Sequence, residues 1–230
     1  MAEYNRYGRP LTAEEVEGGE HRALVGGLWD EIGELQLDFM VSEAGLTPGM
    51  KLLDLGCGSL RGGVHFVDYL DPGNYYGLDI NASLIDAGWE VEIPRYGLGG
   101  KLTRDRLLVT DDFGAWRFGT AFDRVIAVSL WTHLPLNHLQ RSLREAITVL
   151  KPGGALYASV FLCGSERRLF EAIEHRPGGI ITHRDRDPYH YTWGDIRHVC
   201  TQLGVRAELV GDWNHPRAQQ MVRIAMPLGP

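Results

Sequence analysis

The stretch Lys51-Leu-Leu-Asp-Leu-Gly-Cys-Gly-Ser-Leu-Arg-Gly-Gly63 decides the fold of this chain. It begins with a short, mainly apolar run, as expected for a strand that is covered on both faces of a parallel sheet. Gly56 and Gly58 carry no Cβ, so the backbone can turn tightly there and come close to a ligand. A helix should follow, with its first N–H groups pointing back at the turn. The stretch therefore predicts a strand, a ligand-binding turn and a helix.

The composition limits the class of protein. The chain has 230 residues, 44% hydrophobic and 23% charged, as is usual for a globular chain with one sizeable domain. A net charge of -7 disfavours nucleic acid as the main partner, because phosphate binding needs a basic surface. The three cysteines lack a disulfide or zinc spacing. No apolar run suits a membrane span or a signal region, so we expect a cytoplasmic protein without a membrane partner.

Strand and helix patterns alternate along the rest of the chain. Strands are expected at 75–80, 107–109, 122–129 and 155–161, and helices at 28–44, 64–70, about 82–91 and 136–150. Such alternation predicts a parallel sheet with right-handed crossovers. After a helix at 192–203, strands at 205–210 and 219–226 are joined by a link too short for a crossover helix, so they should be antiparallel. The predicted fold is a three-layer, Rossmann-like α/β sheet of seven strands, mostly parallel, with the last strand antiparallel.

The first 45 residues differ in character from the remainder. Thr12-Ala-Glu-Glu15 fits a capping box that begins a short helix, and glycine pairs at 18–19 and 26–27 interrupt the pattern that follows. We expect residues 1–45 to form an arm or lid with one helix, and residues 46–230 to form the ligand-binding domain.

Acidic residues stand at the ends of three predicted strands. Asp54 precedes the glycine turn, Asp79 ends the second strand, and Asp111 and Asp112 follow the third. An acid about 20 residues beyond such a turn is placed to accept hydrogen bonds from both hydroxyls of a ribose; the alternative for Asp79 is a turn or cap. One acid of the 111–112 pair should cap the next helix while the other accepts an adenine amino group. We favour Asp112 for the adenine, since Phe113 beside it is placed to cover the ring.

Several motifs, taken in order, point to one family. They are Leu53-Asp54-Leu-Gly56-Cys-Gly58, Gly77-Leu-Asp79, Asp111-Asp112-Phe113, Phe122-Asp123 and Leu150-Lys-Pro-Gly-Gly154. Together they resemble the class I S-adenosylmethionine-dependent methyltransferases over about residues 50–160. The reversed seventh strand of that family, inserted next to the fifth, matches the predicted antiparallel end. The segment Ser-Leu-Trp-Thr-His-Leu after the fourth strand is similar to those of bacterial small-molecule methyltransferases.

The resemblance implies S-adenosylmethionine as the cofactor. The residues it places beside the cofactor are Asp54, Gly56, Cys57, Gly58, Arg61, Asp79, Ile80, Asp111, Asp112, Phe113 and Ser129. The methionine part would lie over the glycine turn and by Ser129, which ends the fourth strand. The family often has a third glycine where Leu60 stands, and this is the one departure. Arg61 is either a partner of the methionine carboxylate or an exposed residue of the first helical turn.

Two other classes compete with a methyltransferase. A nicotinamide-dependent oxidoreductase would need a glycine where Arg61 stands, so it is the weaker alternative. A protein that binds S-adenosylmethionine without methylating, as a sensor or a reused fold, is the stronger one, because no strong base motif is present. The sequence does not name the methyl acceptor or the oligomeric state.

The expected reaction is methyl transfer to an oxygen, or second to a nitrogen, of a small-molecule metabolite. The cofactor supplies the electrophile, so the protein mainly has to position the nucleophile. His133 is the candidate base for a hydroxyl, because an imidazole ordinarily titrates near neutrality; the alternative is a structural role before the next helix. Trp131 either walls the substrate pocket or lies in the core.

Further candidate substrate residues come from three loops. Tyr189, His190 and Tyr191 lie in a segment that forms either a substrate wall or a packed loop in which Thr192 caps the next helix. His21 and Arg22 of the arm either close over the site or stand in solvent, and His215 either touches substrate or belongs to a plain hairpin. The histidines lack the spacing of metal ligands, so no metal is expected.

Overall fold

The structure is a computed structural model that describes residues 6–226. Residues 1–5 of the predicted arm and 227–230 of the predicted domain lie outside the described residues. The chain divides into two compact units, Met1–Gly119 and Thr120–Pro230, called unit 1 and unit 2 below.

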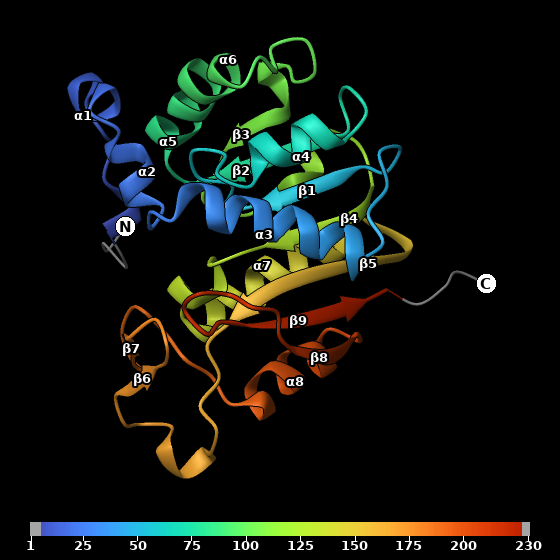
Figure 1. Ribbon diagram of the computed structural model, residues 1–230. Coiled ribbons are helices and arrows are strands. Elements are labelled where there is room, and N and C mark those ends of the chain that lie inside the picture. The colour runs from blue at the N-terminus through green and yellow to red at the C-terminus, as the bar shows by residue number, and fades with distance from the viewer. Residues whose placement is uncertain (1–5, 227–230) are drawn as a thin grey trace. The chain divides into compact units, whose positions relative to one another are not determined.

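Both units alternate strands and helices, as the sequence predicts (Figure 1). Unit 1 contains η1 (Arg6–Gly8), α1 (Ala13–Glu17), α2 (Glu20–Leu24), α3 (Trp29–Ser42), β1 (Leu52–Leu55), α4 (Gly63–Tyr69), β2 (Tyr75–Asp79), α5 (Ala82–Ala87), η2 (Gly88–Glu92), α6 (Ile93–Arg95), η3 (Arg104–Arg106), β3 (Leu107–Val109) and η4 (Ala115–Phe118). Unit 2 contains β4 (Phe122–Ala127), η5 (Trp131–His133), α7 (Leu136–Val149), β5 (Leu150–Val160), η6 (Glu166–Arg168), β6 (Ile173–His175), β7 (Ile180–Thr182), α8 (Trp193–Gln202), β8 (Arg206–Asp212) and β9 (Gln220–Ala225).

Seven strands form one sheet in the order β3-β2-β1-β4-β5-β9-β8. In unit 1, β2 is parallel to both β1 and β3. In unit 2, β4 and β5 are parallel, and β9 runs antiparallel to β5 on one side and to β8 on the other. The predicted Rossmann-like sheet with a reversed strand next to the fifth is therefore confirmed. The separate antiparallel β6–β7 pair, with three residues in each strand, was not predicted.

Burial explains why the deciding stretch forms a strand in unit 1. All four residues of β1 are buried, which a strand within a covered sheet requires. α4 contacts β2, and α3 in turn contacts α4. The helix predicted to run to about residue 91 ends as an α-helix at Ala87 and continues as the wider π-helical turn η2.

Helical periodicity and capping explain the two long helices of unit 2. The buried residues Leu139, Leu143 and Ala146 recur along one face of α7, which contacts β5. Thr192 caps α8, and it forms a capping box with Asp195. Across residues 6–226, no helix combines the length and the apolar character that crossing a bilayer demands.

Candidate functional site

The turn after β1 has the geometry that its glycines predict. Gly56 and Gly58 have φ values of 74° and 53°, in the left-handed region that glycine adopts without strain. The backbone N–H groups of Gly56 and Cys57 both donate to the carbonyl of Leu78, at 2.8 and 3.1 Å. These bonds fasten the turn to β2, so its remaining polar groups have a fixed position.

Leu60 stands where the family often has a third glycine, and its backbone is left-handed. Its φ is 69°, which costs a leucine about 1–2 kcal/mol. Its side chain is fully buried, and its Cγ lies 2.7 Å from the place that a Cβ on Gly88 would occupy. Burying a leucine contributes about 1.5–3 kcal/mol, which offsets the backbone cost. The missing third glycine therefore leaves a left-handed residue at this position of the turn.

Asp79 lies against the turn at the end of β2. Its Oδ2 accepts from the N–H of Gly58 at 2.9 Å, and its Oδ1 accepts from the N–H of Asn81 at 2.8 Å. Burial raises the pKa of Asp79, and these N–H donors oppose the rise. The carboxylate is thus held beside the glycine turn by backbone N–H groups. The next residue, Ile80, is 51% exposed.

Two other predicted cofactor residues contact β2. Asp54 is buried and accepts from the hydroxyl of Tyr75 at 2.9 Å. Burial raises the pKa of Asp54 to about 7, against the effect of that hydrogen bond. The Sγ of Cys57 lies 2.9 Å from the place of a Cβ on Gly77, so only glycine fits there on β2. Burial also raises the pKa of the Cys57 thiol, which keeps it protonated.

The structure changes the assignment of the acidic pair after β3. Both carboxylate oxygens of Asp112 accept from Arg117 at 2.7 Å, and Oδ1 also accepts from the N–H of Gly114 at 3.0 Å. The hydrogen bond from Arg117 holds the pKa of Asp112 well below its usual range. Asp112 therefore makes local contacts with Arg117 and Gly114, and its preferred role as the adenine acceptor is not seen in these contacts. Asp111 is exposed, and Phe113 has a φ of 60°.

Residues 6–27, called the arm below, lie on the glycine turn. Arg61 donates through Nη1 to the carbonyls of Val25 at 2.8 Å and Gly27 at 3.1 Å. A Cγ of Val25 lies 2.7 Å from the place that a Cβ on Gly58 would occupy. Arg61 is buried, so the expectation of an exposed residue in the first helical turn is wrong. In this structure its guanidinium fixes the arm.

A second set of contacts ties the arm to the residues after Asp79. Asn81 donates through Nδ2 to the carbonyls of Tyr7 at 2.7 Å and Arg9 at 2.9 Å. The N–H of Leu11 donates to Oγ of Ser83 at 2.8 Å. The arm is thus hydrogen-bonded to Arg61, which follows the glycine turn, and to Asn81 and Ser83, which follow β2.

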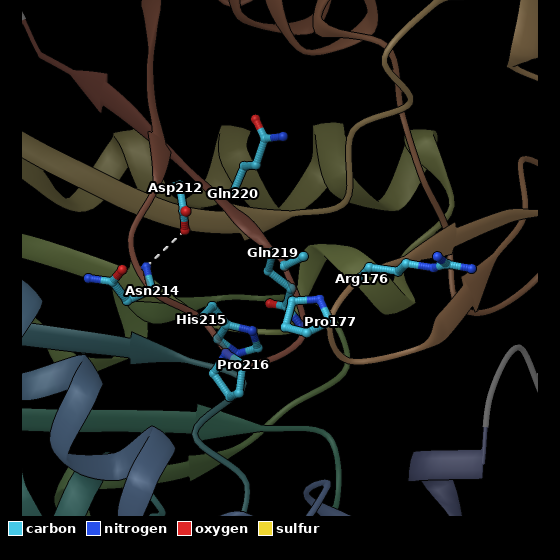
Figure 2. Close-up of a pocket in the computed structure, with 9 residues that line it drawn as sticks. Arg176, Pro177, Asp212, Asn214, His215, Pro216, Gln219 and Gln220 are labelled. Atoms are coloured by element: carbon cyan, nitrogen blue, oxygen red, sulfur yellow. Dashed lines mark hydrogen bonds between the residues drawn. The ribbon is translucent and has the colours of Figure 1, made fainter.

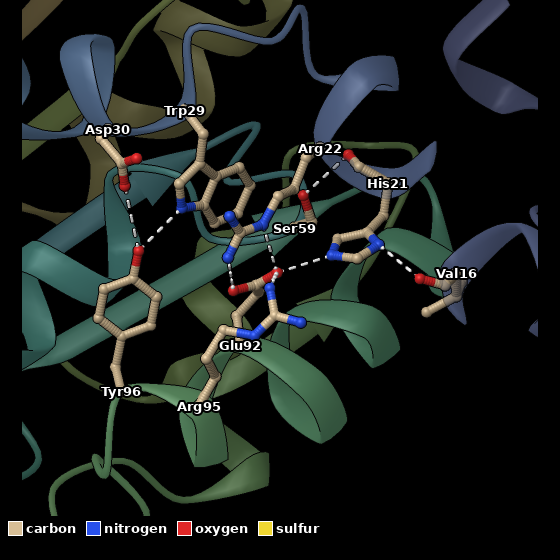
Figure 3. Close-up of polar contacts among 9 residues, drawn as sticks. All are labelled: Val16, His21, Arg22, Trp29, Asp30, Ser59, Glu92, Arg95 and Tyr96. Atoms are coloured by element: carbon tan, nitrogen blue, oxygen red, sulfur yellow. Dashed lines mark hydrogen bonds and ion pairs between the residues drawn. The ribbon is translucent and has the colours of Figure 1, made fainter. Parts of the chain in front are cut away.

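Glu92 is the anchor of the arm, and the sequence analysis missed it (Figure 3). Its side chain is 0% exposed. Its Oε1 lies 2.7 Å from Nε2 of His21 and accepts from Nε of Arg22 at 2.8 Å, and its Oε2 accepts from Nη2 of Arg22 at 2.6 Å. Burial would raise the pKa of Glu92, but hydrogen bonds from Arg22 and His21 prevail and lower it. The only local signal was a glutamate between two apolar residues, Val91 and Ile93.

His21 and Arg22, expected over the substrate or in solvent, are therefore placed on Glu92. His21 is buried, and its Nδ1 lies 3.1 Å from the carbonyl of Val16. Arg22 also stacks over the ring of Trp29, with 4.5 Å from its Cζ to the ring centroid. In this arrangement both side chains hold the arm in place.

Ser129 stands just beyond β4 in unit 2, within a buried polar network. Its backbone N–H donates to Oγ of Ser159 at 2.7 Å, and its Oγ accepts from Nε2 of Gln219 at 3.0 Å. The hydroxyl of Ser159 donates to Oε1 of Gln219 at 2.6 Å. Sequence reasoning did not find Ser159 or Gln219, because their contacts with Ser129 span 30 and 90 residues.

His133 lies in η5, where its Nδ1 pairs with Oδ1 of Asp187. The two side chains are 22% and 19% exposed. Trp131, in the same short helix, is fully buried and donates through Nε1 to Oγ of Ser142 at 3.0 Å. The structure thus places Trp131 in the core of unit 2, the second of its two expected roles.

The aromatic segment before α8 is packed. Tyr189, His190 and Tyr191 are all buried. The hydroxyl of Tyr191 donates to the carbonyl of Leu134, and burial raises its pKa. The two ring nitrogens of His190 lie 2.8 Å from Oγ1 of Thr182 and 2.8 Å from the carbonyl of Leu169. This is the packed loop that the sequence offered as the alternative to a substrate wall.

A pocket of about 400 Å³ opens in unit 2 between the turn after β6 and the link from β8 to β9 (Figure 2). It is lined by Arg176, Pro177, Asp212, Asn214, His215, Pro216, Ala218, Gln219 and Gln220. His215 is buried in its wall, with its ring 5.1 Å from that of Trp213. Because Gln219 also bonds Ser129, the pocket adjoins the end of β4. Among residues 6–226, no group of histidine, cysteine and acidic side chains has the arrangement of a metal site.

Comparisons with known proteins agree with this geometry. Residues 53–156 match a family described as a methyltransferase domain. Sterol 24-C-methyltransferase erg6 of Aspergillus fumigatus is 33% identical over 117 residues, which are 50% of this chain and 29% of that protein. The chain thus spans less than a third of the length of that relative.

Solved structures show the same fold at low sequence identity. Magnesium protoporphyrin IX methyltransferase of Synechocystis, with S-adenosylmethionine bound, is 15% identical with a TM-score of 0.59 over 96% of this chain and 88% of that one. The cyclase SpnF is 16% identical with a TM-score of 0.58 over 87% and 81%. Residues 53–156, which include Asp79 and the glycine turn, thus match a methyltransferase domain, and the solved methyltransferase structure shares the fold.

Proposed function

We propose that the chain moves the methyl group of S-adenosylmethionine to an oxygen of a small-molecule metabolite, with nitrogen as the second choice. The glycine turn, with the Asp79 carboxylate hydrogen-bonded to it, carries the proposal. The oxygen assignment is supported by His133, because an imidazole paired with a carboxylate suits the removal of a hydroxyl proton. When bound, the cofactor supplies an electrophilic methyl group.

The residues of unit 1 fit an adenosine cofactor. A carboxylate has roughly four acceptor positions. Backbone N–H groups of Gly58, Asn81 and Ile80 use three of these on Asp79, which leaves acceptor capacity for a ribose hydroxyl. Ile80 offers exposed apolar surface for an adenine ring, and the exposed Asp111 is the proposed acceptor of its amino group.

The arm is proposed as the lid of this cofactor site. Val25 covers Gly58, and Asn81 holds the start of the arm beside Asp79. A ligand that occupied the turn would meet this cover, so its entry requires the arm to shift. Within the predicted arm of residues 1–45, the part that fills this role is 6–27, and α3 forms the fixed support behind it.

Replacing Asp79 with alanine should weaken S-adenosylmethionine binding by about 1–3 kcal/mol, through lost hydrogen bonds to the ribose. Calorimetric titration of the folded variant measures this. Asp86→Ala is the matched control, because Asp86 is an acid on neighbouring α5 that forms a surface ion pair with Arg104. Equal affinity of Asp79→Ala and the wild type would remove the ribose assignment.

The acceptor is proposed to bind in unit 2, at the pocket lined by Gln219 and His215. Its volume lies within the range of about 300–1,000 Å³ that small-ligand sites show. Amide and imidazole groups in its wall suit an acceptor with hydroxyl or carbonyl groups. The relatives named above act on a sterol and a protoporphyrin, which supports a small molecule as the acceptor of this chain.

Incubation with methyl-labelled S-adenosylmethionine and a pool of hydroxylated and amino metabolites tests the proposed function. Label should appear in one compound, attached to oxygen. Label on nitrogen would select the second choice. Cofactor binding without label transfer would instead favour a protein that binds S-adenosylmethionine for another purpose. The fold likeness to the cyclase SpnF keeps that second candidate open.

A further inference from the structure

The proton on His133 can be assigned from its partner. Nδ1 of His133 lies within hydrogen-bonding distance of Oδ1 of Asp187. An ionised carboxylate only accepts hydrogen bonds, so Nδ1 carries the proton of the neutral ring. The lone pair of the neutral ring is then on Nε2, and the side chain is 22% exposed.

Backbone and hydroxyl contacts fix both members of the pair. Oγ1 of Thr132 donates to the carbonyl of Ser129 at 2.9 Å, which joins η5 to the end of β4. The N–H of Tyr189 donates to the carbonyl of Thr132 at 2.7 Å, and the hydroxyl of Tyr191 donates to the carbonyl of Leu134. The segment that carries Asp187 is therefore bound alongside the segment that carries His133.

We propose that Asp187 is a positioning residue, which orients His133 and fixes its tautomer for base catalysis. This rests on the proposed transfer to oxygen. Nε2 of His133 takes the proton of the acceptor hydroxyl while that oxygen bonds the methyl carbon, and the electron pair of the carbon–sulfur bond returns to sulfur. The imidazolium formed is stabilised by the Asp187 carboxylate beside Nδ1.

A second ion pair in unit 2 serves as a comparison, because its carboxylate has a structural role. Arg184 and Asp195 lie 2.7 Å apart, with side chains 21% and 18% exposed, so their burial matches that of the proposed pair. Asp195 also accepts from the N–H and hydroxyl of Thr192 in the capping box of α8. No such capping contact is found for Asp187 in the described part of the chain, and its side chain is aimed at a titratable ring instead.

The tautomer can be read by long-range proton–nitrogen NMR of the full chain labelled with nitrogen-15. The spectrum is recorded at a pH where the ring is neutral, and His133→Gln assigns its signals. The wild type should show a protonated Nδ1. Asp187→Ala should lower the fraction of rings protonated on Nδ1, and Asp187→Glu should restore it. A wild-type ring protonated on Nε2 would overturn the inference.

Kinetics separate positioning from a structural role. With the compound that becomes labelled in the pool, Asp187→Asn should lower kcat by 10-fold or more, while KM for S-adenosylmethionine stays unchanged. Asp195→Asn is the matched control, which removes a carboxylate of equal burial and should leave kcat and the tautomer unchanged. Wild-type kcat in Asp187→Asn would overturn the inference. The tautomer is measured without turnover, so absence of label transfer would refute the proposed function while leaving that result in place.

Discussion

Replacing His133 with alanine is expected to lower kcat for methyl transfer by about 10²–10⁴-fold, the usual contribution of a general base. The loss should fall on kcat, because His133 is proposed to act on the acceptor hydroxyl and is not one of the proposed ribose or adenine partners Asp79, Ile80 and Asp111. Steady-state kinetics with the labelled acceptor and calorimetry with S-adenosylmethionine measure the two effects separately.

The control for this variant is His198→Ala, which removes an exposed histidine from α8. It should retain the wild-type kcat, and thermal melting should show both variants folded. If folded His133→Ala turned over at the wild-type rate, the histidine would have a structural role, and the acceptor would need no base. That outcome would favour a nucleophile that is already unprotonated at working pH.

Replacing Glu92 with alanine is expected to lower the free energy of unfolding by about 3–5 kcal/mol, as found when one partner of a buried ion pair is removed. The carboxylate is fully buried, and its loss leaves Arg22 and the buried ring of His21 without their acceptor. Urea unfolding measures the loss. Glu90→Ala is the matched control, because Glu90 lies in the same turn but is exposed, and it should change stability by less than about 0.5 kcal/mol.

The stabilisation by Glu92 should depend on pH with a defined sign. The pKa of Glu92 is lowered from 4.5 on folding, so the folded state binds its proton less readily than the unfolded state. The contribution is therefore present above about pH 4.5 and is lost as the pH falls through the lower pKa of the folded state. The stability difference between the wild type and Glu92→Gln should shrink below pH 4.5. A difference that stayed constant down to pH 2 would contradict the ion-pair account.

Loss of Glu92 should loosen the attachment of the arm to the rest of unit 1. Arg61 and Asn81 still hold the carbonyls of the arm in Glu92→Ala, but the cluster around His21 and Arg22 is gone. Backbone amides of residues 6–27 should then exchange hydrogen faster than those of β1, which limits the change to the arm. Equal acceleration in both would show that Glu92 supports the whole of unit 1.

The local sequence was sufficient to predict the elements that depend on neighbouring residues. The apolar run before Gly56 gave a buried strand, and the short link after β8 required an antiparallel partner. The capping box at Thr12 was predicted, and Thr192 was offered as a helix cap; the partners of both stand three residues away. Such signals arise from backbone geometry and periodicity, which act over a few residues.

The contacts of the site residues were harder to predict from the sequence, since each side chain had several plausible partners. Asp112 was preferred for the adenine, yet Arg117 takes both of its oxygens. Trp131 was offered as either pocket wall or core, and only its burial decided between them. Composition and spacing do not predict which of two adjacent acids faces a cation, because that depends on how the turn places their side chains.

The sequence by itself determined the alternation of strands and helices, the reversed end and the glycine turn, because each follows from periodicity, link length or the conformations open to glycine. Only the tertiary structure decided the partners of Glu92 and His133, which lie 71 and 54 residues away at His21 and Asp187. It also showed that Leu60 adopts the left-handed conformation in place of a third glycine. Its buried side chain offsets the backbone cost, and that burial exists only once α4 and η2 are packed around the turn.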